Sequence, residues 1–325
     1  MTLVHVLTTG GTIASLSGPD GRRAAVPGDE LLATISPPPG VELRSRALMT
    51  RPSFGFGTGD LLAIARAVRD ALADGADGVV VAHGTDVMEE TAFLTDLTHD
   101  DPRPVVFTGA QRPADDPAPD GPANLADAIR VAADPIARSR GVLVVFDGVA
   151  LPAFGVTKID TLSSRAFANR RGGPALRVAA GRVVSVATPE RPALFLDPDV
   201  PDLPRVDVVA LYAGADTVLL TAAVEAGARG IVLAALGAGN ATPAITAAVA
   251  DLIERGVPVL VCSRVPNGPA VPLYTSGGGS DLAGVGAVFG GDLSPWQGRL
   301  LLAAAIAARP DDPAGAVREA LKDLS

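Results

Sequence analysis

The chain has 325 residues, of which 48% are hydrophobic and 19% charged, a composition typical of a globular protein and not of a disordered one. Its net charge of −9, without a block of lysines and arginines, argues against nucleic acid or an anionic membrane surface as a main partner. No apolar stretch approaches the ~20 residues of a membrane-spanning helix. The N-terminus leads directly into a predicted strand and lacks a signal-peptide pattern, so we expect a cytoplasmic protein.

Short apolar runs that are typical of buried strands alternate with helical patterns along the chain. The predicted strands are, in order, Leu3–Leu7, Val79–Ala82, Val105–Phe107, Val142–Phe146, Val206–Leu211, Ile231–Leu236 and Val257–Val261. The predicted helices are Asp60–Leu72, Val87–Leu97, Asn124–Ala133, Val218–Ala226, Pro243–Arg255, Pro295–Ala308 and Pro313–Asp323. This alternation predicts an α/β protein with a doubly wound, mostly parallel sheet.

The length and a proline-rich interval predict two domains. Residues 188–205 are rich in proline and show no periodicity, so we expect a linker there. It separates a larger N-terminal catalytic α/β domain, residues 1–187, from a smaller C-terminal α/β domain, residues 206–325. Within the second domain, Gly277–Gly279 is expected to be a flexible loop. The single cysteine, Cys262, lies beside an apolar run and is expected to be buried.

Two predicted strands end in turns that combine glycine with a hydroxyl group. The first strand runs into Thr9–Ser15, which reads Thr-Gly-Gly-Thr-Ile-Ala-Ser, and the second into His83–Asp86, which reads His-Gly-Thr-Asp. Glycine allows a ligand to approach the backbone closely because it lacks Cβ. Ligands of doubly wound sheets bind at the carboxyl ends of the strands. We therefore expect Thr12 and Thr85 to face one crevice.

Each turn also has a purely structural interpretation. In the first turn, the threonine would cap a helix. In the second, Asp86 would be the N-cap and Glu89 would complete a capping box. Since a capping aspartate still exposes its second oxygen to a ligand, the two interpretations of Asp86 are compatible.

Lys158 is an unusual residue for this composition. Only two of the 27 basic residues are lysines, and the other is Lys322. A desolvated lysine can lose its proton, whereas arginine stays protonated, and a threonine hydroxyl is a poor nucleophile without such help. Lys158 is therefore a candidate base, with a surface lysine as the alternative. The sequence contains no hydrolase elbow, dinucleotide fingerprint, phosphate-binding loop or spaced Cys/His cluster.

Six segments together carry a resemblance to a known family: Thr9–Ala14, His83–Ala92, Gly109–Pro113, Asp120–Leu125, Val156–Lys158 and Ser263–Pro266. With these segments, the chain resembles the bacterial-type L-asparaginases, the asparaginase/glutaminase family, over essentially its whole length. The resemblance implies an amidohydrolase of asparagine catabolism that converts L-asparagine to L-aspartate and ammonia, with some glutaminase activity. It implies neither a metal nor an organic cofactor.

The resemblance also implies roles for individual positions. Thr12 corresponds to the nucleophile that forms a β-acyl-enzyme. Thr85, Asp86 and Lys158 correspond to a second catalytic group, in which Lys158 polarises Thr85 and Asp86 holds the α-ammonium of the substrate. Backbone N–H groups near the two threonines, with Ala110 opposite, would bound the oxyanion site. The implied substrate-binding residues are Gly11, Thr58, Gly59, Gly84, Thr85, Asp86, Ala110 and Asn240.

Thr58 takes the place of a hydroxyl residue that binds the α-carboxylate. The family forms homotetramers built from intimate dimers, and Asn240 matches a residue that the neighbouring subunit supplies. Small amino acids and further copies of the chain are thus the implied partners.

The sequence departs from the family pattern at three places. A loop tyrosine that helps to activate the nucleophile is missing, and Ala25 holds its place. Gly59 replaces a glutamine that often follows the carboxylate-binding residue, which leaves the preference for asparagine over glutamine open. An acidic residue lent by the neighbouring subunit is not identifiable, and Tyr274 or Asp281 is the hypothetical replacement.

Two other functions remain open from the sequence. A protein that lost catalysis with the missing tyrosine would bind aspartate or asparagine without forming product. A subunit of a tRNA-dependent amidotransferase would need a partner chain, and the acidic charge and the lack of an RNA-binding extension count against it.

Overall fold

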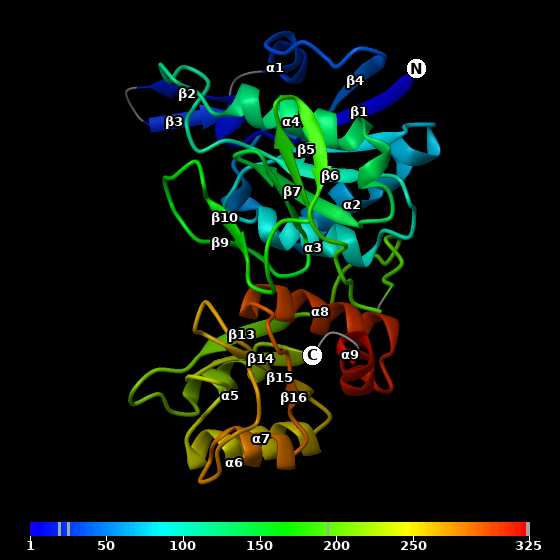
Figure 1. Cartoon of the computed structure of the whole chain (residues 1–325). Coiled ribbons are helices and arrows are strands. Elements are labelled where there is room, and N and C mark those ends of the chain that lie inside the picture. The colour runs from blue at the N-terminus through cyan, green and yellow to red at the C-terminus, as the bar shows by residue number, and fades with distance from the viewer. Residues whose placement is uncertain (19–20, 25–26, 194, 323–325) are drawn as a thin grey trace. The chain divides into compact units, whose positions relative to one another are not determined.

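The computed structural model describes residues 1–18, 21–24, 27–193 and 195–322. The chain divides into two compact units, Met1–Glu190 and Arg191–Ser325 (Figure 1). Each unit is an α/β structure with its own sheet, and the sheet of the larger first unit is mostly parallel. The predicted fold class is confirmed. In the segment 186–205, none of the described residues belongs to a helix or a strand.

The first unit contains an eight-stranded sheet in the order β12-β11-β8-β7-β6-β5-β1-β4. The parallel part consists of β7 (Val142–Phe146), β6 (Val105–Thr108), β5 (Gly78–Ala82), β1 (Thr2–Thr8) and β4 (Val41–Ala47). The antiparallel part consists of β8 (Val149–Pro152), β11 (Leu176–Ala179) and β12 (Arg182–Ser185). Ala82 pairs with both Thr8 and Thr108, so β1, β5 and β6 end side by side.

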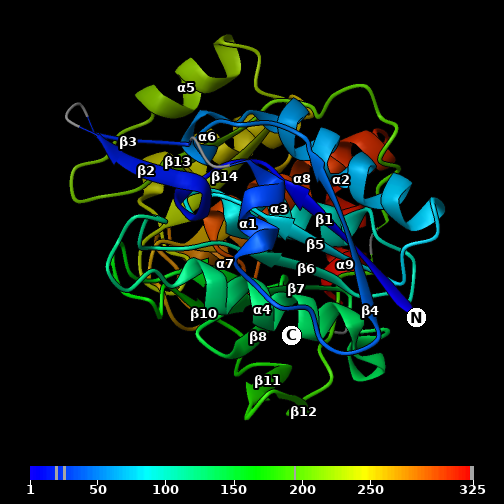
Figure 2. The same ribbon diagram turned by 90° about the horizontal axis from the view of Figure 1, so that it is seen from above.

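Helices cover both faces of this sheet (Figure 2): α2 (Thr58–Ala73) and α3 (Met88–Leu97) cover one face, and α1 (Gly28–Ala33) and α4 (Gly121–Ala133) the other. Val79 and Val81 share a core with Ile64 of α2, whereas Val80 shares a core with Leu125 of α4. Successive residues of a strand point to opposite faces. All five residues of β5 are therefore buried, which explains its unbroken apolar run.

The second unit contains a four-stranded parallel sheet made of β13 (Val206–Ala210), β14 (Gly230–Ala235), β15 (Val259–Ser263) and β16 (Val288–Phe289). On one face, α5 (Val218–Glu225), α6 (Pro243–Glu254) and α7 (Gly279–Gly284) share its core. On the other face lies α8 (Pro295–Ala308), against which α9 (Pro313–Leu321) packs. Gly298 of α8 lies against Cys262, which is fully buried as expected.

Elements without a long apolar run were not predicted from the sequence. The edge strand β4 is only partly buried and alternates charged with uncharged residues. The ribbon strands β9 (Val156–Lys158) and β10 (Phe167–Asn169) have three residues each and form a two-stranded sheet of their own within the described part of the chain. The paired strands β2 (Ser15–Gly18) and β3 (Gly21–Ala24) have four residues each.

The expected loop at Gly277–Gly279 is shorter than predicted, because it includes Gly277 and Gly278 but not Gly279. All three glycines are buried, and Gly279 begins α7. The Gly277 N–H donates to the carboxylate of Asp281 at 2.6 Å, and the Gly277 carbonyl accepts from the Thr246 hydroxyl at 2.7 Å. Close packing, here against the backbone of Pro243, is therefore the reason for glycine at position 277.

Candidate active site

The loops that follow β1, β5 and β6 meet at the carboxyl ends of these strands. Gly11 lies directly against Gly84, since a Cβ on Gly11 would come within 2.5 Å of the Gly84 Cα. Gly11 also has a φ of 86°, a backbone conformation that favours glycine. A Cβ on Gly121 would lie 2.8 Å from Ile13 Cγ1 and 3.4 Å from Ala110 Cβ. The turn that carries Thr12 therefore adjoins both other loops.

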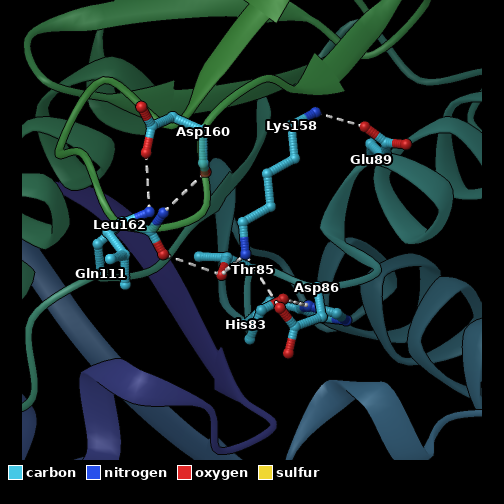
Figure 3. Close-up of polar contacts among 9 residues, drawn as sticks. His83, Thr85, Asp86, Glu89, Gln111, Lys158, Asp160 and Leu162 are labelled. Carbon is cyan, nitrogen blue, oxygen red and sulfur yellow. Dashed lines mark hydrogen bonds and ion pairs between the residues drawn. The ribbon is translucent and has the colours of Figure 1, made fainter.

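Lys158 links the second turn to the β9–β10 ribbon (Figure 3). Its ammonium donates to Thr85 Oγ1 at 2.8 Å and to Asp86 Oδ1 at 3.0 Å. The Lys158 side chain is 18% exposed and that of Asp86 51%, so solvent screens the ion pair from the Asp86 side. Lys158 is thus not a free surface lysine. The sequence-predicted residues Thr85, Asp86 and Lys158 form one hydrogen-bonded group.

Gln111 belongs to this group, although the sequence interpretation assigned it no role. The buried Thr85 hydroxyl donates to Gln111 Oε1 at 3.2 Å, and Gln111 Nε2 donates to the carbonyl of Asp160 at 3.2 Å. The backbone N–H groups of Gln111 and Arg112 both donate to the Asp120 carboxylate. Gln111 is therefore held at its backbone and at its amide. The sequence signal for Gln111 was its position next to Ala110, within the segment Gly109–Pro113 that contributes to the family resemblance.

The capping interpretations of both turns are wrong. Helix α3 begins at Met88 after Val87, without a side-chain cap. Asp86 instead accepts from Lys158, and Glu89 accepts from the Lys158 backbone N–H. The 3₁₀ helix η1 (Thr12–Ala14) follows Gly11, again without a side-chain cap. Neither turn uses its hydroxyl or carboxylate to begin a helix.

Ser53 is a second residue without an assigned role, and it packs against the second turn. A Cβ on Gly84 would lie 2.5 Å from Ser53 Oγ. Ser53 is 1% exposed, and its hydroxyl has no hydrogen-bond partner among the residues that the structure describes. A buried polar atom without a partner costs about 1–3 kcal/mol. Thr58, the α-carboxylate residue predicted from the sequence, and the neighbouring Gly59 lie in the first turn of α2, and a side chain at Gly59 would meet open space.

His83 fixes the peptide that joins Gly84 to Thr85. Its Nδ1–H donates to the Gly84 carbonyl at 2.6 Å, and its ring lies between the rings of Phe56 and Phe107. Burial lowers the pKa of His83 to about 4, so the ring is neutral near pH 7. In a trans peptide, the carbonyl and the following N–H point in opposite directions. The bond to His83 therefore turns the Thr85 N–H away from the ring.

We expect His83 to make the stability of the protein depend on pH. Its pKa is about 4 in the folded protein and 6.5 in the unfolded chain, so the unfolded chain binds the proton first as the pH falls. The free energy of unfolding should therefore fall by about 3 kcal/mol between pH 6.5 and 4 on account of this group. Urea unfolding across this range measures the effect. His83→Asn keeps an N–H donor but does not titrate, so the variant should lack this part of the pH dependence, and identical pH profiles would contradict the expectation.

Asn240 lies in the second unit, where it contacts the glycine-rich segment before α7. Its Oδ1 accepts the Gly279 N–H at 3.1 Å. In the same segment, the Asp281 carboxylate is occupied by the Gly277 N–H. The Tyr274 side chain is exposed. The second unit thus holds Asn240 together with Tyr274 and Asp281, the two hypothetical replacements for the acidic residue of the neighbouring subunit.

The described residues contain no group of three or more His, Cys, Asp or Glu side chains that could hold a metal ion. In the same part of the chain, no helix has the length and apolar character needed to cross a membrane. Ala25, at the position of the missing loop tyrosine, lies outside the described residues.

Models of protein families match both units of the chain. Residues 3–191 match the N-terminal domain of asparaginase, and residues 205–318 match the glutaminase/asparaginase C-terminal domain. The chain belongs to the asparaginase family. This confirms the resemblance drawn from the six sequence segments.

Other members of the asparaginase family are similar to this one over most of their length. A probable L-asparaginase of Deinococcus radiodurans is 37% identical over 93% of this chain and 91% of its own. L-asparaginase 2 of Escherichia coli is 38% identical over 73% of this chain and 68% of its own. A glutaminase-asparaginase of Pseudomonas aeruginosa is 29% identical over 82% of this chain and 76% of its own. The crystal structure of a probable cytoplasmic L-asparaginase from Campylobacter jejuni matches 99% of both chains with a TM-score of 0.88 at 29% identity.

Proposed function

We propose that this member of the asparaginase family hydrolyses L-asparagine to L-aspartate and ammonia through an ester on Thr12, with some glutaminase activity. The observation that carries the proposal is the hydrogen-bonded group of Lys158, Thr85 and Asp86 next to the Gly11–Gly84 contact. Relatives named L-asparaginase and glutaminase-asparaginase support the substrate class. Release of ammonia from L-asparagine by the purified protein tests the proposal.

In this mechanism Thr12 supplies the nucleophile. Its Oγ1 gives up its proton and forms a bond to the carboxamide carbon of the substrate, the carbon–nitrogen bond breaks, and the nitrogen takes up that proton and leaves as ammonia. Gly11 and Gly84 allow this reaction next to Thr85 because neither has a side chain between the two turns. Backbone N–H groups of the turns, with Ala110 opposite, would stabilise the oxyanion, and such donors contribute about 10²–10³-fold each in rate.

Lys158 and Thr85 move the protons. The Lys158 ammonium polarises the Thr85 hydroxyl, while Asp86 holds the ammonium in place. Gln111 Oε1 accepts a hydrogen bond from the Thr85 hydroxyl and so orients it. In the second step, a water adds to the ester carbon. The hydrogen-bonded group of Thr85 and Lys158 is placed to relay the proton of that water to the departing Thr12 oxygen, which regenerates the free threonine and releases aspartate.

Asp86 and a hydroxyl group would bind the charged ends of the substrate. One oxygen of Asp86 binds Lys158, and the half-exposed carboxylate offers the other to the α-ammonium. Thr58 is the α-carboxylate residue proposed from the sequence, and Gly59 is the neighbouring position that leaves the preference for asparagine over glutamine open. Ser53 is the candidate from the structure, because its buried hydroxyl has no partner among the described residues.

Removal of these two hydroxyls distinguishes the candidates. A hydrogen bond to a charged group is worth about 1.5–3 kcal/mol, so loss of the carboxylate contact should raise KM about 10- to 100-fold. We expect this increase for Ser53→Ala and an almost unchanged KM for Thr58→Ala. The measurement is steady-state ammonia release at varied L-asparagine concentration. The reverse order of the two KM values would assign the carboxylate to Thr58.

A catalytically impaired amino-acid-binding protein is the second candidate function. It is favoured by Ala25, which stands where the family has a tyrosine that activates the nucleophile. Such a protein would bind aspartate or asparagine, visible in calorimetry, without releasing ammonia. The two measurements on one preparation therefore separate the two functions.

We further propose a homotetramer of intimate dimers in which the neighbouring subunit supplies Asn240. Of the two replacement residues, Tyr274 is the stronger candidate, since it is exposed whereas Asp281 is bound to Gly277. Light scattering at assay concentrations tests the tetramer.

A cytoplasmic location is proposed from the likeness to the Campylobacter jejuni protein. A relative in Haemophilus influenzae is a probable periplasmic L-asparaginase, and cell fractionation decides between the two compartments.

A further inference from the structure

The carboxylate of Glu89 binds the short strand that carries Lys158. Glu89 is the second residue of α3 and is 6% exposed. Its Oε2 accepts the backbone N–H of Lys158 (Figure 3), and the Thr157 side chain also forms a hydrogen bond to the carboxylate. The carboxylate thus contacts two consecutive residues of β9.

This contact adds a polar link to the packing of β9, whose Val156 is buried in the core of the first unit. The strand has three residues, and among the strands that the structure describes it pairs only with β10, in a two-stranded sheet separate from the eight-stranded one. Lys158 is the last residue of β9, whereas Thr85 and Asp86 follow β5 of the large sheet. Strand pairing among the described residues therefore does not set the distance between Lys158 and Thr85. Glu89 lies three positions after Asp86, so its bond to the Lys158 backbone links β9 directly to the segment that follows β5.

Lys158 is consequently held at both ends. Its backbone N–H binds Glu89, and its ammonium binds Thr85 and Asp86. A lysine side chain has many rotamers, and ordering it costs about 1.5–2 kcal/mol in lost freedom. A fixed backbone limits the positions that the ammonium can reach.

We propose that Glu89 is a positioning residue, which binds the backbone of Lys158 and so sets the contact between the Lys158 ammonium and the Thr85 hydroxyl. This inference rests on the proposed function, in which that contact takes part in catalysis. Burial raises the pKa of Glu89, and the hydrogen bonds from Lys158 and Thr157 oppose this shift. A buried carboxylate destabilises a fold unless its oxygens are hydrogen-bonded, and here β9 supplies the bonds.

Three substitutions test the positioning role. Glu89→Ala removes the acceptor, Glu89→Gln keeps a carbonyl oxygen without the charge, and Glu90→Gln removes a neighbouring charge as the control. Because misplacement of a catalytic group by about 1 Å costs about 10²-fold in rate, we expect Glu89→Ala to lower kcat about 10²-fold. KM for L-asparagine should change less than about threefold, since Glu89 makes no proposed contact with the substrate. Glu89→Gln should keep at least about a tenth of kcat, and Glu90→Gln should stay within about twofold of the unsubstituted enzyme.

Circular dichroism establishes that the variants fold. If Glu89→Ala does not fold, Glu89→Asp replaces it, because it keeps the charge and shortens the reach, with an expected loss of about tenfold or more in kcat. A folded Glu89→Ala with unchanged kcat would overturn the inference. So would a Glu89→Gln variant as slow as Glu89→Ala, since the charge and not the hydrogen bond would then matter.

Lys158→Met in the same assay separates this inference from the proposed function. If Lys158→Met is fully active, the proposed function fails. If Lys158→Met is inactive while Glu89→Ala is normal, only the positioning role of Glu89 fails.

Discussion

Thr12→Ala is expected to lower kcat for L-asparagine by at least about 10⁴-fold, because removal of a nucleophile leaves only the binding and oxyanion contributions. Thr12 is the first residue of η1 and does not cap it, so the fold should persist. Binding of aspartate should change little, since the reacting hydroxyl contributes mainly in the transition state. Ammonia release measures kcat, and calorimetry with aspartate measures binding.

Two controls accompany Thr12→Ala. Thr12→Ser keeps a hydroxyl at the same position and should recover much of the rate. Thr221→Ala removes a hydroxyl from an exposed position of α5 and should have no effect. Activity of Thr12→Ala above about a tenth of the unsubstituted value would exclude Thr12 as the nucleophile and direct attention to Thr85.

Lys158→Met is expected to lower kcat by about 10³-fold, because general acid–base groups contribute about 10²–10⁴-fold. Methionine has a similar length but lacks the ammonium. It therefore loses the 2.8 Å contact with Thr85 Oγ1 and the 3.0 Å contact with Asp86 Oδ1. The loss of an attractive charge near Asp86 should also alter KM. Steady-state ammonia release gives both constants.

The chain offers a matched control, because Lys322 is its only other lysine. Lys322→Met makes the same chemical change at the exposed end of α9, and we expect unchanged kcat and KM. Equal activity of the two methionine variants would contradict the role of Lys158. A Lys158→Arg variant adds information, because arginine keeps the charge but does not give up its proton.

Buried elements of the fold were predictable from the sequence because burial leaves a pattern. The run Val79–Ala82 marked β5, whose residues are apolar on both faces. Helix α8 begins at Pro295 and ends at Ala308, as predicted, because Ser294 caps it and proline fits its first position. The exposed strand β4 and the three-residue strand β9 lack such a pattern, and their positions depend on tertiary contacts.

The candidate site was predictable where a residue was unusual in its sequence context. Lys158 is one of two lysines, and Thr85 and Asp86 follow a clear strand. The contributions of Ser53 and Gln111 were not predictable in this way, because both are neutral polar residues. Gln111 had one signal, its position next to Ala110, and its role became visible with the hydrogen bond from Thr85. Ser53 is distinguished by its packing against Gly84, and such proximity between distant segments leaves no mark in a single sequence.

The central claim is that the acyl group of the substrate is carried by Thr12 while Lys158 acts through Thr85. The most direct test is rapid acid quenching during turnover of L-asparagine, followed by peptide mass spectrometry of the trapped β-aspartyl ester. We predict that the ester lies on the peptide containing Thr12 and accumulates when Lys158→Met slows its hydrolysis. An ester on Thr85 instead would contradict the account, since the hydroxyl bound to Lys158 would then be the nucleophile.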